Sequence, residues 1–274
     1  MKFSQTSGFL LLLLWSLLCL MWACAEKIQL SGEELQEIGL RVFENECGGS
    51  ESCLTWWNAG EDFASLGIGH FIWYPAGREG PFEEGFPRLI AFMKRCGVHI
   101  PVWVEDQACP WSDRDAFMED FDSEKMQELR LFLSGTKDLQ AEFLGKRLEE
   151  ALPGMLAAAD RDKRSRVRSQ FYRVAGSPGG MYALVDYVNF KGEGTSPTER
   201  YQGQGWGLLQ VLEQMDGPDR GIEAVEEFSR SAKTMLRIRV KNSPNDRGEE
   251  RWLPGWEKRI DTYPAAARQA GSSA

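Results

Sequence analysis

Histidine and cysteine are scarce in this chain, and their scarcity excludes several kinds of catalysis. The 274 residues include 2 His and 6 Cys. With only His70 and His99, the sequence offers few candidates for the histidine of a Ser-His-Asp triad. The cysteines form no Cys-x-x-Cys pair and the histidines do not cluster, so the sequence predicts no metal site. It contains neither a phosphate-binding loop nor a dinucleotide-binding fingerprint, and we expect no cofactor.

Positive charge is also limited. There are 32 Lys and Arg against 41 Asp and Glu, which gives a formal net charge of −9. Nucleic acids and anionic lipid surfaces select clustered Lys and Arg, so we expect no nucleic-acid partner. Six Arg or Lys do fall within residues 160–173. We interpret them as a solvated helix face, with an anion-binding site as the alternative.

Only one long hydrophobic run is present, over residues 9–22, and it is too short for a comfortable membrane span. The positive residue Lys2 precedes this run and the small residues Ala23-Cys24-Ala25 follow it, which predicts a signal peptide over residues 1–25. No second run of spanning length follows. We therefore expect a bacterial periplasmic or secreted protein without a transmembrane span, whose net charge after loss of Lys2 is −10. A lipid anchor at Cys24 remains an alternative.

Four cysteines follow the predicted leader, and an even number in an exported protein suggests two disulfides. Proximity in the sequence favours Cys47–Cys53 and Cys96–Cys109. The other pairings and free buried thiols remain open.

The hydrophobic pattern predicts an α+β protein that is mainly α, with a small β-hairpin element near the N-terminus. A capping box at Ser31-Gly-Glu-Glu34 opens a first helix, and Gly48-Gly49 ends it. Residues 63–74 read as short strands and residues 97–115 as an irregular loop. Further helices are expected over residues 81–95, 124–134, 137–151, 155–174, 179–189, 205–215 and 219–240. We expect one domain over residues 26–263 and, from its Ala, Gly and Ser content, a flexible tail over residues 264–274.

Glu46 is the first candidate for chemistry, because it falls at the end of the first predicted helix. The negative end of a helix dipole and nearby aromatic residues such as Trp57 both disfavour an ionised carboxylate. A carboxyl group kept in its acid form is what protonation of a glycosidic oxygen requires. The alternative is that Glu46, like its neighbour Glu44, is an ordinary polar residue on a helix surface.

The segment that begins at Glu46 and ends with Ser65-Leu-Gly-Ile-Gly-His70 resembles the catalytic region of phage-type lysozymes. In that family a helix-end Glu precedes an Asp, a Thr and a Gly-x-Gly-His motif. The resemblance implies a lysozyme-like helical domain in which Glu46 is the general acid. It places Ser65 at the Thr position, where its hydroxyl orients water, and gives His70 a site-lining role. No Asp lies at the expected distance, and we take Glu61 as the second carboxylate.

Three later segments are similar to parts of the same superfamily. Residues 183–194 contain an Asn-aromatic pair at Asn189, and residues 205–211 resemble a Gly-Leu-Met-Gln segment of goose-type lysozymes and lytic transglycosylases. Residues 253–259 resemble the Leu-x-Gly-Leu-x-x-Arg segment of phage endolysins. On this basis Asn189, Trp206 and Gln210, with Trp57, are expected to bind the sugar. For the tryptophans, burial in the core is the alternative.

The resemblance implies an exported glycoside hydrolase that cleaves peptidoglycan or a related polysaccharide such as a chitosan-like polymer. Two departures from the family keep other functions open: the interval from Glu46 to His70 is long, and the chain is acidic where lysozymes are often basic. A lytic transglycosylase would need only Glu46. A non-catalytic protein with a lysozyme-like fold would bind cell walls without cleaving them.

Overall fold

The computed structural model describes residues 30–80, 84–105 and 108–272. The predicted leader, residues 1–25, and the alternative lipid-anchor position Cys24 lie outside these ranges. Within them, no helix has both the length and the apolar composition needed to cross a membrane.

The first described helix, α2 (Gly32–Cys47), begins and ends where the sequence predicts. The Ser31 hydroxyl accepts a hydrogen bond from the Glu34 amide, and the Glu34 carboxylate accepts one from the Ser31 amide. At the other end, Gly48 adopts a left-handed conformation with φ 54°. This is the conformation that glycine adopts at little cost, so the helix ends at Cys47 and Gly48 caps it.

A short 3-10 turn, η1 (Glu51–Leu54), leads from α2 into a small antiparallel sheet. Its strands are β1 (Thr55–Trp56), β2 (Ala64–Leu66) and β3 (Phe71–Trp73), in the order β1-β2-β3. Ser65 in the central strand pairs with Trp56 on one side and Ile72 on the other. The predicted β element near the N-terminus is therefore confirmed, and so is the mainly helical composition.

The other helices follow the sheet in the chain. They are α3 (Phe86–Arg95), α4 (Val102–Glu105), α5 (Arg114–Glu119), α6 (Glu124–Gly135), α7 (Lys137–Ala158), α8 (Arg164–Ala175), α9 (Gly180–Lys191), α10 (Leu208–Gln214), α11 (Ile222–Asn242), α12 (Leu253–Ile260) and α13 (Thr262–Ser272). Between them lie the hairpin β4 (Arg200–Tyr201) and β5 (Gln204–Gly205) and two short turns, η2 (Asn245–Arg247) and η3 (Glu249–Arg251).

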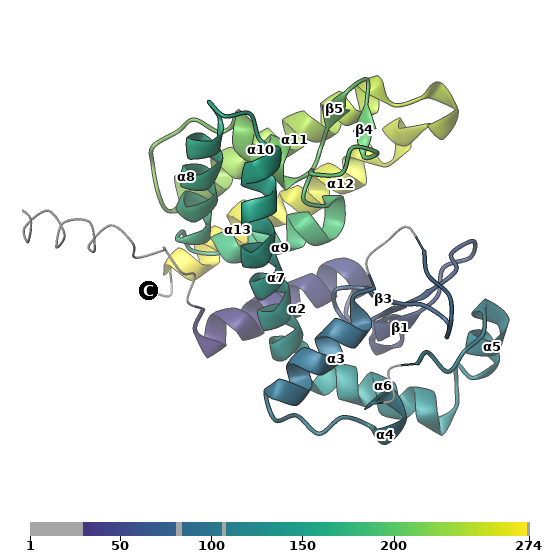
Figure 1. Cartoon of the computed structure of the whole chain (residues 1–274). Helices are drawn as coiled ribbons and strands as arrows, with labels where there is room; N and C mark the ends of the chain where they lie inside the picture. The colour runs from purple at the N-terminus through teal and green to yellow at the C-terminus, as the bar shows by residue number, and fades with distance from the viewer. Residues whose placement is uncertain (1–29, 81–83, 106–107, 273–274) are drawn as a thin grey trace, which may run out of the picture.

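Two halves meet along α2 and α7 (Figure 1). The sheet half contains β1–β3 with α3–α6, and the helical half contains α8–α13 with β4 and β5. Helix α2 packs on α7 and on α9, and α7 also contacts α3 and α8. A hydrophobic core runs through both halves and includes Val42, Leu66, Leu144 and Leu184. The end of α2, which carries Glu46, therefore lies where the halves meet.

The predicted Cys96–Cys109 disulfide is wrong, whereas Cys47–Cys53 is present. Cys96 is exposed at the end of α3, and Cys109 is buried beside Trp111. Burial raises the pKa of Cys109 to about 11, which keeps it as a thiol. The two cysteines are close in sequence, but one faces solvent and the other faces the core.

The predicted flexible tail is also wrong over most of its length. Residues 262–272 form α13, and Tyr263, Ala266 and Ala267 are buried. Alanine favours helix, and these small side chains allow close packing against α11 and α9. The composition that suggested disorder thus belongs to a packed helix.

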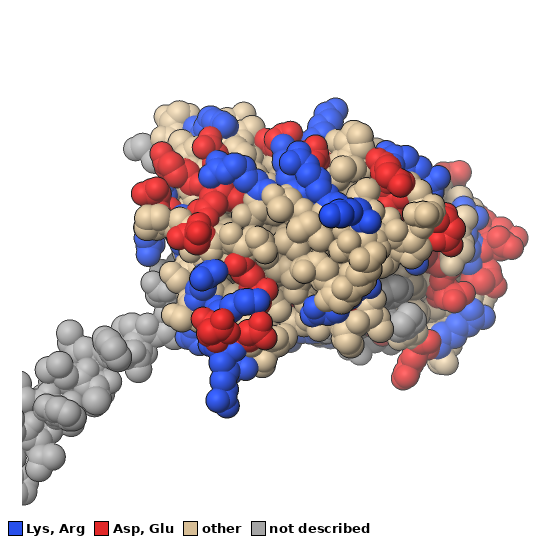
Figure 2. Space-filling model, turned by 90° about the horizontal axis from the view of Figure 1, so that it is seen from above, with Lys and Arg blue, Asp and Glu red and all other residues tan. Residues whose placement is uncertain are grey.

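Charged side chains alternate in sign over the face shown in Figure 2. Lys and Arg lie among Asp and Glu there, and they do not gather into a continuous basic stripe. Such a mixture on this face differs from the basic surface typical of nucleic-acid binding.

Candidate active site

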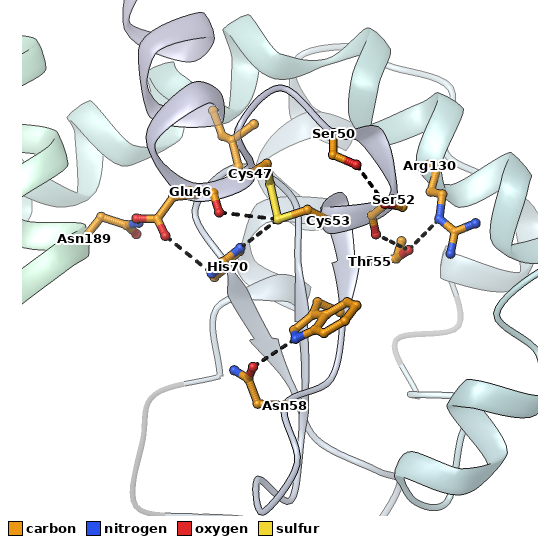
Figure 3. The surroundings of a disulfide bond; sticks show 12 residues. Glu46, Cys47, Ser50, Ser52, Cys53, Thr55, Asn58, His70, Arg130 and Asn189 are labelled. Atoms are coloured by element: carbon orange, nitrogen blue, oxygen red, sulfur yellow. Dashed lines mark hydrogen bonds and ion pairs between the residues drawn. A yellow bond between two sulfur atoms is a disulfide. The ribbon is translucent and has the colours of Figure 1, made fainter. Parts of the chain in front are cut away.

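Glu46 lies in the last turn of α2 with its carboxylate between the two halves of the molecule. Asn189 of α9 donates from Nδ2 to Glu46 Oε1 at 2.9 Å, and Arg259 of α12 donates from Nη2 to the same oxygen at 2.5 Å. His70 Nδ1 lies 3.6 Å from the other oxygen, Oε2. The carboxylate side chain retains 13% exposure. It is thus held on several sides and still partly exposed, and Figure 3 shows two of its neighbours, Asn189 and His70.

His70 owes its position to the tight turn between β2 and β3. The turn residue Gly67 has φ 71°, and a Cβ there would lie 2.3 Å from Gln140 Oε1. That oxygen accepts a hydrogen bond from the Ile68 amide at 2.9 Å. Helix α7, which carries Gln140, therefore holds the turn in place. His70 itself has φ 46°, which is uncommon for a residue with a Cβ. The Gly-Ile-Gly-His motif therefore serves a tight turn in which the position of Gly67 leaves no room for a side chain.

The Cys47–Cys53 disulfide lies against the opposite side of the His70 ring. The Cys53 sulfur is 3.6 Å from His70 Nε2 and 3.5 Å from the backbone oxygen of Glu46. In Figure 3 the imidazole lies between the sulfur and the Glu46 carboxylate. The disulfide thus fixes both the end of α2 and the ring that faces the carboxylate.

A buried hydrogen-bond network positions Arg259. Asp186 of α9 is fully buried and accepts from Arg259 Nε at 2.9 Å and Nη2 at 2.8 Å. The same carboxylate accepts from Tyr263 at 2.7 Å and from Asn45 at 3.1 Å. Asp186 therefore supports Arg259, whose Nη2 donates to both Asp186 and Glu46.

The charges of this cluster stabilise the guanidinium more than burial destabilises it. Burial works against a charged Arg259, but the hydrogen bonds and charge of Asp186, with the charge of Glu46, raise its pKa. Burial and the Asp186 charge raise the pKa of Tyr263 as well, so it stays a neutral donor. One guanidinium thus serves two carboxylates, and the cluster keeps a negative charge when both are ionised.

The two residues predicted to activate water are not joined to Glu46 by any hydrogen bond in the described ranges. Ser65 is buried in the central strand, with 5% exposure. Glu61 accepts a hydrogen bond from Asn58 Nδ2 at 3.0 Å in the loop after β1. Figure 3 shows Asn58 apart from Glu46, with His70 between them. The Glu61 carboxylate is therefore held within the loop between β1 and β2.

Three residues predicted to bind sugar have structural surroundings instead. Trp57 is 1% exposed and donates to the Glu61 backbone oxygen, so its ring is not available for stacking. Trp206 is buried, and its backbone oxygen accepts from Tyr187. Gln210 is buried and bonds the backbones of Gly207 and Gly194. For the two tryptophans the structure supports the core alternative, and Gln210 holds the backbone of the segment that precedes α10.

Sequence reasoning missed Asp186, Asn45 and Gln140 as supports of the site. Asp186 and Arg259 do fall within two of the segments that resemble lysozyme motifs. The sequence carries no local signal for them, because the contact between the buried Asp186 and Arg259 joins segments far apart in the chain.

The described residues contain one group with three metal-ligand atoms close together. The two sulfurs of Cys47 and Cys53 and a nitrogen of His70 lie within 4.8 Å of one another. Metal binding requires thiolates, and sulfurs joined in a disulfide are not thiolates. In the disulfide form this group therefore supplies one imidazole ligand.

Comparisons of this chain with protein families, curated proteins and solved structures find no match.

Proposed function

We propose that this protein is a glycosidase that cleaves the glycan strands of peptidoglycan, with Glu46 as its general acid. One observation carries the proposal. Glu46, His70, Asn189 and Arg259 come from three separate segments that resemble lysozyme motifs, and the last three all surround the Glu46 carboxylate. Glu46, His70 and Asn189 were chosen for their likeness to one superfamily, and a third segment with such a likeness contains Arg259. An accidental likeness would give these residues no reason to meet.

The reaction follows from the chemistry of one accessible carboxyl group. In its acid form, Glu46 gives a proton to the glycosidic oxygen while the bond from that oxygen to the anomeric carbon breaks. The leaving sugar departs as an alcohol, and the resulting carboxylate accepts a proton from the hydroxyl that attacks the anomeric carbon. Asn189 and Arg259 hold Oε1, so the proton is carried on Oε2, the oxygen beside His70.

The setting outside the cytosol rests on two features. The predicted leader directs export, and the Cys47–Cys53 disulfide is of a kind that persists in oxidising compartments. Peptidoglycan is the polysaccharide that an exported bacterial protein meets first.

A lytic transglycosylase is the second candidate, and the position of the carboxylates favours it. Asp186 is fully buried and committed to Arg259, while Glu61 is bonded within the hairpin loop. Neither carboxylate is free to activate water beside Glu46. A hydroxyl of the substrate itself would then be the attacking group. The product is then an internal anhydro sugar, one water lighter than the product of hydrolysis.

The test is digestion of purified cell-wall sacculi by the mature protein, followed by mass analysis of the released fragments. We expect release by the native chain and its loss in Glu46→Gln, with Glu44→Gln as the matched control on the same helix. Fragments with a free reducing end indicate hydrolysis, and anhydro ends indicate transglycosylation. Binding without release by the native chain would instead favour the non-catalytic alternative.

A further inference from the structure

An aromatic surface leads along α12 toward the proposed active site. Trp252, Trp256 and Arg259 follow one another at steps of four and three residues, which places them on one face of the helix. Trp252 is 43% exposed, and its ring lies 6.0 Å from that of Trp256. Trp256 in turn lies 6.4 Å from Phe190, whose ring has the Arg259 guanidinium 4.3 Å above it. The rings thus connect solvent to the residue that binds Glu46.

A mostly buried amine lies in the middle of this surface. Lys191 Nζ is 3.5 Å from the Trp256 ring centre and 3.8 Å from that of Phe190. Lys191 is 9% exposed, and no ion pair or hydrogen bond of its amine is found in the described part of the chain. In its ammonium form this group has three donors, and aromatic faces satisfy them only in part. Such a group can accept an anionic partner.

The surrounding charges explain why the amine has not found that partner within the protein. Burial, with the positive charges of Arg239 on α11 and Arg259 on α12, lowers the pKa of Lys191 to about 6. Glu249 and Glu46 act in the opposite direction with smaller effect. Glu249 is bound at both oxygens by Arg239, and Glu46 is bound by Arg259. Both acids are therefore engaged with guanidinium groups.

A second cation lies at the exposed end of the rings. The Arg251 guanidinium is 4.6 Å from the Trp252 ring centre. The chain is acidic overall, yet cations gather at this aromatic surface. The combination suits a ligand with an apolar face for the rings and a carboxylate for the cations. A pyranose ring that bears an acidic substituent has both.

We propose that Trp252, Trp256 and Lys191 form a subsite for an acidic amino sugar, next to Glu46. The sugar face packs on the exposed Trp252 ring and the half-buried Trp256 ring, and its free carboxylate pairs with the Lys191 ammonium. This proposal rests on the proposed function, because it supplies the substrate specificity of the same site. Binding of the carboxylate favours the charged amine, so it is accompanied by uptake of a proton at neutral pH.

The experiment measures binding by isothermal titration calorimetry in a Glu46→Gln background, which prevents turnover. The two probes are a peptide-free glycan fragment containing N-acetylmuramic acid and a neutral chitin oligomer of the same length. We expect the acidic probe to bind about tenfold more tightly, which corresponds to ~1.4 kcal/mol. Titrations in two buffers of different ionisation enthalpy should reveal the proton taken up with the acidic probe only.

Two variants test the subsite, each with a matched control. Lys191→Met should abolish both the preference for the acidic probe and the proton uptake, while Lys258→Met, a charge loss on the exposed side of α12, should change neither. Trp252→Ala should weaken both probes about tenfold, while Leu131→Ala, which removes an exposed apolar side chain from the sheet half, should not.

Retention of the acid preference by Lys191→Met would overturn the proposal, as would equal binding of the two probes by the parent chain. If Lys191→Met does not fold, absence of proton uptake by the parent is the contrary result. Cleavage of sacculi with no acid preference would reject the subsite and leave the proposed function intact. Acid-selective binding without any cleavage would reject the proposed function and retain the subsite.

Discussion

The carboxylate of Glu46 depends on a guanidinium that is anchored elsewhere. Arg259 makes two hydrogen bonds to Asp186 and one to Glu46, and Asp186 is also held by Tyr263 and Asn45. Asp186 is therefore a positioning residue, since it acts on Glu46 only through Arg259. Removal of the Asp186 carboxylate leaves the mostly buried Arg259 guanidinium with Glu46 as its one remaining carboxylate partner among the described residues.

Asp186→Ala should lower the free energy of unfolding by roughly 3–5 kcal/mol, because it breaks a buried ion pair. Urea denaturation provides the measurement. The matched control is Glu257→Ala, which breaks the more exposed pair with Arg237 and should cost less than about 1 kcal/mol. Equal losses in the two variants would show that the Asp186 network does not support the fold.

The pKa of Lys191 makes the stability of the protein depend on pH. The native amine releases its proton near pH 6, whereas in the unfolded chain it does so near its usual value of 10.5. Between these values the unfolded state binds more protons, so stability rises with pH. Below about pH 6 both states are protonated and the destabilisation is complete.

Lys191→Met should therefore be more stable than the native chain at pH 7, and its advantage should shrink steadily toward pH 10. Unfolding midpoints of the two proteins, measured in parallel from pH 5 to pH 10, provide the test, with Lys258→Met as the control. An advantage that is constant over the whole range would contradict the burial of an amine with a lowered pKa.

At the scale of elements, the turn between β2 and β3 brings His70 of the sheet half next to Glu46. Gly67 and Gly60 both have positive φ, at 71° and 89°. A Cβ at Gly67 would collide with the Gln140 side chain, whereas a Cβ at Gly60 would meet open space. Substitution of Gly60 therefore tests the cost of backbone conformation alone, whereas substitution of Gly67 adds the cost of a close contact with Gln140.

Gly60→Ala should cost about 1–2 kcal/mol from backbone strain alone, and Gly67→Ala about 2–4 kcal/mol because overpacking adds to that strain. Chemical denaturation of both variants gives the comparison. We also expect Gly67→Ala to move His70 away from Glu46 and to reduce cleavage. Equal costs at the two positions would mean that the contact with Gln140 does not fix this turn.

Across the whole molecule, sequence predicted the parts that depend on local chemistry. The capping box at Ser31, the stop at Gly48 and the short antiparallel sheet all follow from neighbouring residues, and all are present. The sequence predicts a break between the helices at 137–151 and 155–174, but α7 continues through Pro153, because Leu152, Met155 and Leu156 on either side of it are buried. The sequence does not predict α13 for a related reason. Its composition suggests disorder, but its packing against the rest of the protein makes it a helix.

The candidate site divides in the same way. Glu46, His70 and Asn189 were predicted from motifs, and the structure brings them together. The partners of Glu46 on α9 and α12 are 143 and 213 residues away in the chain, and no local periodicity reports such contacts. Trp57, Trp206 and Gln210 were chosen for residue type, which does not distinguish a sugar-binding face from a core position.

The most direct measurement is the initial rate of glycan release from sacculi by the native chain and by Glu46→Gln. Both proteins should be folded, with matching circular dichroism spectra and the Cys47–Cys53 disulfide intact. A general acid contributes about 10²–10⁴-fold, so the rate should fall by at least about a hundredfold in the variant. Glu44→Gln should release glycan at the native rate. Equal rates for the native chain and Glu46→Gln would contradict the assignment of Glu46 as the acid.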